Sequence, residues 1–223
     1  MKFKILLLAS LFIQTACTQY FEKVQPQDIR SSVDFLSSDI LKGRETTTEG
    51  ELVASQFIKS KFIKAGIQPY FETYFDSFES KGFKGVNVVG FIEGIDPELK
   101  NEVVLLGAHY DHIGWGGVGS GSRKPDIKAI HNGADDNASG VAGTLAVARA
   151  IKACAKAGDG AGCTIIFIAF NGEEAGLLGS SAYTKSPTVP LGEIRGLFNM
   201  DMISRGPPRQ IFIDGGKVGE PVV

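Results

Sequence analysis

The sequence predicts an α/β fold with a mainly parallel, mixed sheet flanked by helices, and two observations carry that prediction. First, the runs 101–109 and 163–170 are continuously apolar, as expected for strands buried on both faces. Second, such runs alternate with helical patterns, above all the alanine-rich segment 138–154. The 223 residues, of which 43% are apolar, fit one domain with a sizeable core.

The remaining elements follow from the same periodicities. Helical spacing of apolar residues predicts helices over 27–39, 50–66 and 175–186, and strand patterns occupy 70–78, 86–94, 194–202 and 209–215. Between the first two helices, 41–50 is a polar connector. The glycine-rich segment 110–130 is one long irregular loop, and loops of that length are more often functional than not.

The N-terminus has the pattern of an export signal over residues 1–17. Positive residues in MKFK precede ILLLASLFI, an apolar stretch too short to span a bilayer as a mature helix. Small residues then lead to Cys17, the position where a bacterial lipoprotein signal is cut and its cysteine lipidated. We therefore expect one domain over 18–223 in a periplasmic or membrane-anchored lipoprotein, with plain secretion as the alternative.

Charge and cysteine usage narrow the partners and the redox chemistry. The net charge is −2, and no basic run is long enough to indicate nucleic-acid binding. Cys154 and Cys163 flank the glycine-containing loop 155–162. In an exported protein they could form a disulfide, or they could remain reduced at the end of a helix and the start of a strand.

Polar residues follow the end of each buried strand. Ligands of open α/β sheets bind outside the carboxyl ends of the strands, so we expect these side chains to meet at one edge. They are His109, Asp111, Glu173, Glu174 and Asp201, joined by Asp135 and Asp136 at the start of the helix over 138–154.

So many carboxylates in one crevice would repel one another unless cations neutralise them. Oxygen ligands alone suit calcium or magnesium, whereas an added histidine favours zinc, with manganese or cobalt as alternatives. Such a set could hold two metal ions about 3.5–4 Å apart with a bridging carboxylate. Singly, the acids have simpler explanations, such as a helix cap or a solvated turn. Their joint placement at several strand ends predicts a metal site.

These residues also carry a family resemblance. The segments GAHYDHIG, NGADDNASG, FNGEEAGLLGS and NMDMI resemble the co-catalytic zinc aminopeptidases of metallopeptidase family 28, in the same order and spacing. The resemblance covers most of 18–223 and implies the catalytic domain of a phosphorylase/hydrolase-like zinc exopeptidase fold. It implies peptide substrates, from which water activated by two zinc ions removes N-terminal residues.

The resemblance also implies a set of metal ligands. His109 and Asp201 resemble the ligands of one zinc ion, and Glu174 resembles the carboxylate ligand of the second. Asp136 resembles the aspartate that bridges both ions, and its peptide bond to Asn137 is then expected to be cis.

Two further carboxylates match family positions close to the reaction. Glu173 resembles the general base that takes a proton from the metal-bound water and returns it to the leaving amine. Asp111 resembles the acid that orients the His109 ring.

The sequence departs from the family at the second zinc ion, which usually has a histidine ligand well downstream of the NMDM-like strand. No histidine follows His131. The chain is then either a C-terminally truncated fragment or a degenerate protein that binds one metal weakly. We favour the fragment, since an ending inside the sheet would expose a strand edge. Because His112 and His131 lie near the loop of the first zinc, both are geometrically awkward replacements.

Two other functions remain open on the sequence. A glutaminyl-cyclase-like enzyme uses a related fold with one zinc, although the pair Glu173–Glu174 and the bridging Asp136 favour a peptidase. A non-catalytic binding lipoprotein on the same scaffold is supported only by the missing histidine. Within the peptidases, carboxypeptidase and dipeptidase action are alternatives to aminopeptidase action.

Overall fold

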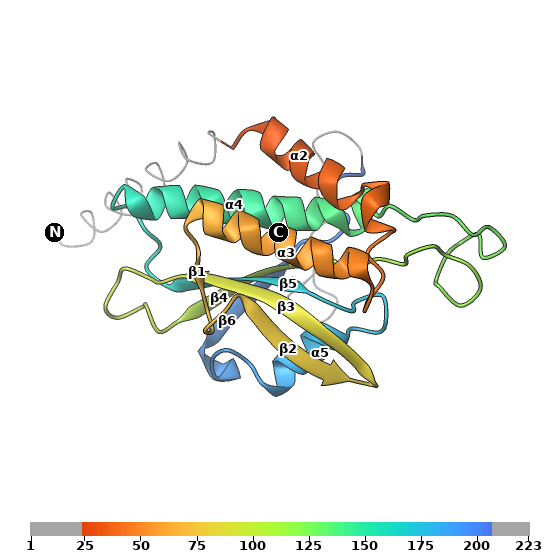
Figure 1. Ribbon diagram of the computed structural model, residues 1–223. Helices are drawn as coiled ribbons and strands as arrows, with labels where there is room; N and C mark the ends of the chain where they lie inside the picture. Colours follow the sequence, from red (N-terminus) through yellow and green to blue (C-terminus); the bar gives the residue numbers. More distant parts are fainter. Residues whose placement is uncertain (1–23, 207–223) are drawn as a thin grey trace.

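The computed structural model describes residues 24–206, which form a mixed β-sheet with helices on both sides (Figure 1). The expected α/β fold class with a mixed sheet flanked by helices is therefore confirmed, although the sheet is not mainly parallel, since three of the five pairings between the described strands are antiparallel. The export signal over 1–17 and the strand expected at 209–215 lie outside the described residues. Within 24–206, no helix combines the length and the hydropathy needed to cross a membrane.

The described elements lie close to the predicted segments. The helices are α2 (Pro26–Leu36), α3 (Glu49–Ala65), α4 (Gly140–Lys156) and α5 (Leu178–Lys185), with short helical turns η1 (Asp39–Leu41), η2 (Ala134–Ser139) and η3 (Leu191–Glu193). The strands are β1 (Gln68–Pro69), β2 (Phe75–Ser80), β3 (Phe83–Ile92), β4 (Val103–His109), β5 (Thr164–Phe170) and β6 (Ile194–Asn199).

The sheet has a parallel part and an antiparallel part. Its strand order is β1-β3-β5-β4-β6, and β2 pairs with β3. Strand β4 runs parallel to both of its neighbours, β5 and β6, whereas β3 is antiparallel to β1, β2 and β5. The carboxyl ends of β4, β5 and β6 therefore meet at one edge of the sheet.

The two faces of the sheet carry separate cores. In Figure 1, α2, α3 and α4 lie on one face and α5 on the other. Successive residues of β5 point to opposite faces, so Phe167 packs with the helices of the first face and Ile168 packs with the smaller second core. Both side chains are fully buried. This two-sided burial explains why β5 is apolar throughout.

The helix expected at 138–154 begins later and after a break. Regular helix starts at Gly140, and the preceding turn contains Asp136 with φ −104° and ψ 96°, which is not helical. The bond between Asp136 and Asn137 is cis, as expected. The Asn137 side chain accepts the Gly140 N–H at 3.0 Å and donates to the Met200 carbonyl at 2.9 Å. This side chain therefore links the break to the segment that follows β6.

The disulfide considered between Cys154 and Cys163 is absent, because Cys163 is a free cysteine. Backbone bonds hold the segment before Cys163 in another place. Ile95 N–H donates to the Ala161 carbonyl at 2.9 Å, and Asp96 N–H donates to the Gly162 carbonyl at 3.3 Å. The end of this loop is thus fixed against the connection between β3 and β4, while Asp159 N–H donates to the Cys154 carbonyl of α4 at 3.1 Å.

Candidate metal centre

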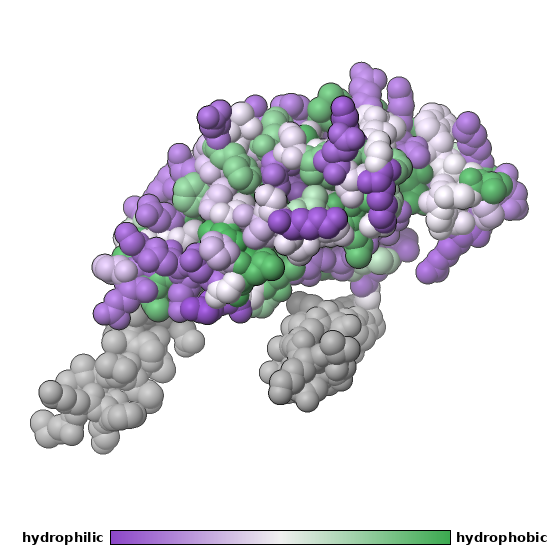
Figure 2. Space-filling view, turned by 90° about the horizontal axis from the view of Figure 1, so that it is seen from below, coloured by the Kyte–Doolittle hydropathy of each residue, from purple (hydrophilic) through white to green (hydrophobic). Residues whose placement is uncertain are grey.

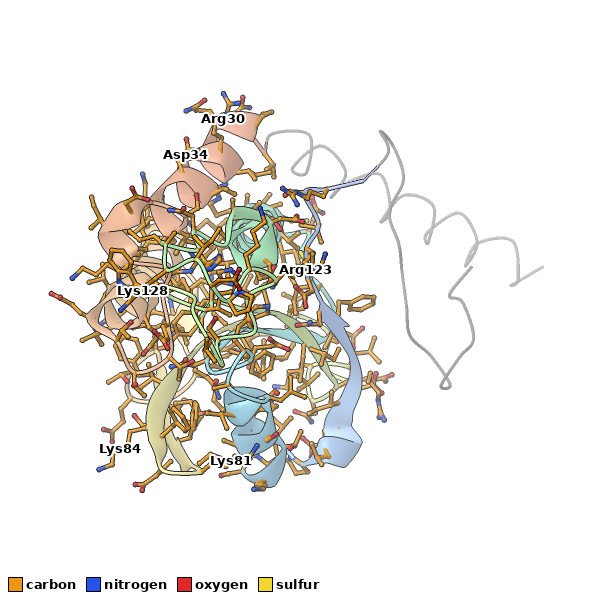
Figure 3. All side chains as sticks on the ribbon, turned by 90° about the vertical axis from the view of Figure 1, so that its right-hand side faces the viewer. Arg30, Asp34, Lys81, Lys84, Arg123 and Lys128 are labelled. Carbon is orange, nitrogen blue, oxygen red and sulfur yellow. The ribbon has the colours of Figure 1, made fainter. Side chains whose placement is uncertain are left out.

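The polar residues named from the sequence converge at the carboxyl edge of β4, β5 and β6. His109 is the last residue of β4, Glu173 and Glu174 follow β5, and Asp201 follows β6. Asp136 reaches the same edge from the break before α4. Figure 3 views this side of the molecule, where Arg123 and Lys128 label the long loop over 110–130.

A first donor group consists of His109, Asp136 and Asp201. Their ligand atoms lie within 4.8 Å of one another. His109 Nε2 is 3.2 Å from Asp136 Oδ1 and 3.5 Å from Asp201 Oδ1. The histidine side chain is 3% exposed, whereas the two aspartate side chains are 36% and 45% exposed. One nitrogen and two oxygen donors that converge in this way fit a divalent metal ion of the zinc type.

A second donor group consists of His112, Asp136 and Glu174, again with ligand atoms within 4.8 Å. His112 Nδ1 lies 2.6 Å from Glu174 Oε1. Asp136 belongs to both groups, so its carboxylate lies where a bridge between two ions would be needed. The described residues of this group also fit a metal ion.

The position of His112 corrects the sequence analysis, which took it to be awkward for the second ion. After β4, His112 forms an isolated parallel bridge with Glu45, in which its N–H donates to the Arg44 carbonyl at 3.1 Å. The imidazole lies beside Glu174. His131 is in neither of the donor groups found in 24–206, and its ring packs against Gly116, where an added Cβ would lie 2.1 Å from Nε2.

Asp111 is completely buried and binds the backbone that carries both glutamates. Its Oδ1 accepts the Glu173 N–H at 3.0 Å, and its Oδ2 accepts the Glu174 N–H at 3.1 Å and the Thr46 hydroxyl at 3.2 Å. His109 Nδ1 lies 3.7 Å from Asp111 Oδ1, longer than a hydrogen bond. The contacts of Asp111 therefore fix the turn after β5 more directly than they fix the His109 ring.

The electrostatics of the group without a metal ion are dominated by His109. Burial lowers the pKa of its imidazole, but the carboxylates of Asp111, Asp136 and Asp201 outweigh burial and raise this pKa to about 12. The hydrogen bond to His109 in turn lowers the pKa of Asp136. The imidazolium thus balances the carboxylates, and a metal ion at Nε2 has to displace its proton.

Glu173 has the opposite shift. Partial burial, followed by the charges of neighbouring carboxylates, raises the pKa of Glu173 above its usual value, although the His109 charge opposes the shift. A carboxylate of raised pKa is a better proton acceptor near neutral pH.

Two cavities flank the donor groups, and His112 lines both. One has a volume of about 510 Å³ and includes Phe83, Ile113 and Glu174 in its wall. The other, of about 430 Å³, includes Asp136 in its wall. Both are large enough to admit a small organic group beside the donor atoms.

The polar connector expected at 41–50 contains a residue that the sequence analysis missed. Arg44 is 1% exposed. Burial lowers its pKa to about 10, while the charges of Asp111, Asp136 and Glu174 act in the opposite direction. An arginine in a polar stretch carries no periodic signal of burial, so the sequence pattern alone could not identify it.

The α/β sheet belongs to the class of zinc exopeptidase folds, and its carboxyl edge carries two donor groups that share one aspartate. The family model described as peptidase family M28 matches residues 87–222, and the chain belongs to that family.

Individual proteins agree with this assignment. The chain is 36% identical over 124 residues to a probable leucine aminopeptidase of Arthroderma otae, which covers 55% of this chain and 32% of that protein. The chain spans about a third of the length of such curated relatives.

Solved structures of other proteins share the fold. A Zn-dependent exopeptidase from Parabacteroides distasonis has a TM-score of 0.57 at 23% identity, covering 78% of this chain and 61% of that one. A glutaminyl cyclase from Tannerella forsythia has a TM-score of 0.60 at 22% identity, covering 80% and 62%. At these identities the likeness shows the fold alone.

Proposed function

We propose that this protein is a metal-dependent aminopeptidase that removes N-terminal residues from peptides. The observation that carries the proposal is the pair of donor groups that share Asp136 at the carboxyl edge of the sheet. Membership of peptidase family M28 and the similarity to a probable leucine aminopeptidase support it. The proposal concerns the whole protein, of which this chain supplies the described part of the site.

The proposed ligand set follows the two donor groups. His109, Asp136 and Asp201 would hold one zinc ion, and Asp136 and Glu174 would hold the second. Among the described residues, His112 is the nitrogen donor of the second group. When bound, such a pair of ions supplies the acidity that turns a water molecule into a nucleophile near neutral pH and polarises the carbonyl of the substrate.

The protein residues contribute proton transfer and positioning. Glu173 is the proposed general base, because its pKa is raised by burial and its backbone is fixed one residue before Glu174. It accepts a proton from the attacking water and passes it to the leaving amine. Asp111 accepts the backbone N–H groups of both glutamates. These bonds fix the positions of the proposed base, Glu173, and the proposed ligand, Glu174, relative to each other.

The alternatives from the sequence receive less support. A glutaminyl-cyclase-like, single-zinc enzyme is favoured only by a likeness of fold, and the second donor group speaks against it. A non-catalytic binding lipoprotein has no specific contact in its favour. Export, a lipid anchor at Cys17 and a catalytic domain over 18–223 remain part of the proposal, and labelling with radioactive palmitate, compared with a Cys17→Ala control, tests the anchor.

The experiment for the proposed function combines metal analysis with one substitution. Elemental analysis is expected to give close to two zinc ions per molecule of the whole protein, and one or none for the chain of 223 residues alone. Glu173→Gln should lower the hydrolysis of leucine p-nitroanilide by about 10²–10⁴-fold, the usual contribution of general acid–base catalysis, without changing the metal content. An unchanged rate in Glu173→Gln would show that the assignment of the base is wrong.

A further inference from the structure

The segment 42–46 lies against the two loops that carry the donor groups of the metal centre. The side chain of Arg44 holds it there. Among residues 24–206 the buried guanidinium forms no ion pair with a carboxylate, and it donates to four backbone carbonyls instead. Nε donates to Tyr110 at 2.8 Å, Nη1 to Asn132 at 2.8 Å and also to Leu36, and Nη2 to Gly133 at 3.0 Å. One side chain therefore joins the end of α2, the residue after His109 and the loop that leads to Asp136.

The backbone of the same segment forms a second set of contacts with the loop after β4. The Arg44 carbonyl accepts the His112 N–H at 3.1 Å, and the Gly43 carbonyl accepts the Gly114 N–H at 3.1 Å. Gly43 has φ +75°, and a Cβ there would lie 2.5 Å from the Gly114 carbonyl oxygen, so only glycine fits. This close approach of Gly43 to Gly114 holds the segment that carries Arg44 against the loop after β4.

Burial of a guanidinium is costly unless its hydrogen bonds and its charge are both compensated. The four carbonyls satisfy the hydrogen bonds. The charge is compensated by Asp111, Asp136 and Glu174, all of which belong to the site. A planar fork with five N–H groups can serve several carbonyls at fixed angles, whereas a lysine ammonium on a flexible stem cannot.

We propose that Arg44 is a positioning residue of the metal centre. Its guanidinium fixes the loop over 131–134 against the end of β4, so that Asp136 and His109 have their ligand geometry before an ion binds. It also places a positive charge near the carboxylates of Asp111, Asp136 and Glu174. This role rests on the proposed metal-dependent function, and Arg44 lies outside the segment 87–222 that the family model matches.

The test uses Co²⁺ as a probe, because its visible absorption reports the coordination geometry of the ion. The wild-type chain, Arg44→Lys and Arg44→Ala are loaded with Co²⁺, and affinity is measured by competition with a chelator. The exposed Arg30 on α2 supplies the matched controls Arg30→Lys and Arg30→Ala. Circular dichroism and thermal unfolding establish separately that each variant is folded.

Arg44→Lys keeps the charge but loses the fork, so we expect Co²⁺ to bind it about 10–100-fold more weakly, with altered absorption bands. Arg44→Ala should lose more, and free guanidinium ion at millimolar concentration should restore its bands and part of its affinity. The Arg30 variants should match the wild type in both. A ligand that binds the folded state also stabilises it, so restoration of the bands without a rise in the unfolding temperature is what separates positioning from a general loss of stability.

Each other outcome overturns a stated part. A folded Arg44→Lys with wild-type bands and affinity would overturn the positioning role alone. If Arg44→Ala does not fold, Arg44→Lys decides, and unfolding of both would make Arg44 a general stability residue and overturn the proposal. A wild-type chain that binds no Co²⁺ would overturn the positioning role of Arg44, and a whole protein that binds none would overturn the proposed function.

Discussion

Strands β4 and β6 run side by side and in parallel, and each leads to a proposed metal ligand, yet their surroundings differ. Leu105 of β4 is 4% exposed and Leu197 of β6, its direct register partner, is 52% exposed. Figure 2 views the molecule from below relative to Figure 1 and shows exposed apolar residues among hydrophilic ones on that face. Among the described residues, β4 is supported by packing on both faces, whereas β6 is supported mainly by its backbone bonds to β4.

The ligands that follow the two strands reflect this difference. His109 is enclosed in the interior, whereas Asp201 is half exposed. The place of Asp201 is instead set by its neighbours, since Met200 N–H donates to the Gly107 carbonyl at 2.8 Å and Met202 N–H donates to Asn137 Oδ1 at 3.3 Å. A ligand position can thus be defined by hydrogen bonds at its flanks where packing is sparse.

The largest expected effect comes from removing the enclosed ligand. His109→Gln should weaken zinc binding by more than the roughly 10–100-fold that loss of a supporting hydrogen bond costs, because a buried ligand has no mobile neighbour to replace it. Asp201→Asn should cost less, since the amide oxygen still faces the site from an exposed position. Competition with a chelator measures both. An equal or larger loss in Asp201→Asn would show that exposure does not govern the contribution of a ligand here.

The next prediction compares how much the side chains of β4 and β6 contribute to the free energy of unfolding. Leu105→Ala leaves a cavity in a packed interior and should lower the free energy of unfolding by about 2–5 kcal/mol. Leu197→Ala, at the paired position of β6, should change it by no more than about 0.5 kcal/mol. Urea denaturation of both variants gives the two values. Similar losses would mean that the exposed face of β6 is covered in solution.

The same contrast explains what the sequence could predict about the fold. Strands β4 and β5 were predictable within two residues at their starts, because burial on both faces requires continuous apolar runs. The strand expected at 70–78 begins only at Phe75, since its partly alternating pattern does not distinguish strand from the turns before it. The antiparallel direction of β3 against β5 was not predictable, because the connections and not the side-chain pattern set the direction of a strand.

The candidate site also contains residues whose places the sequence could predict and residues whose places it could not. His109, Glu173, Glu174 and Asp201 were predictable as neighbours, since residues that follow parallel strands meet at one edge whatever the loops do. The places of His112 and Arg44 depend on local backbone geometry. Lys42 and Arg44 both have φ 49°, a left-handed conformation that no pattern in a polar segment indicates. Contacts made by such segments become visible only in three dimensions.

A smaller effect is expected at the support of the two glutamates. Asp111→Asn should weaken zinc binding by about 10–100-fold, because the amide presents a donor where Asp111 accepts N–H groups from Glu173 and Glu174. Thr46→Val removes only one hydrogen bond to the same carboxylate and should cost clearly less. Both affinities come from chelator competition. A larger loss in Thr46→Val would mean that the hydrogen bond from Thr46 to Asp111 matters more for zinc binding than the bonds from the two glutamate N–H groups.

The smallest predicted effect concerns an acid enclosed beside the end of β4. The Tyr110 hydroxyl lies 2.6 Å from Glu51 Oε1 and 2.8 Å from the Val86 carbonyl, but it has only one hydrogen to donate. A protonated Glu51 resolves the conflict, because it donates to the tyrosine oxygen while the tyrosine donates to Val86. Burial, which raises the pKa of Glu51 above 4.5, favours the same protonated form.

The sign of the pH dependence follows from that shift. The unfolded chain releases the Glu51 proton near pH 4.5, below the pKa of the folded state. The stability that this group contributes is therefore fully present below about pH 4.5 and is lost as pH rises through the folded pKa. Glu51→Gln keeps a neutral donor at every pH, so its stability relative to the wild type should increase above pH 4.5 and then level off. The exposed Glu72→Gln should show no such trend in urea denaturation at the same pH values, and a relative stability of Glu51→Gln that falls with pH would mean that Glu51 is ionised in its enclosed position.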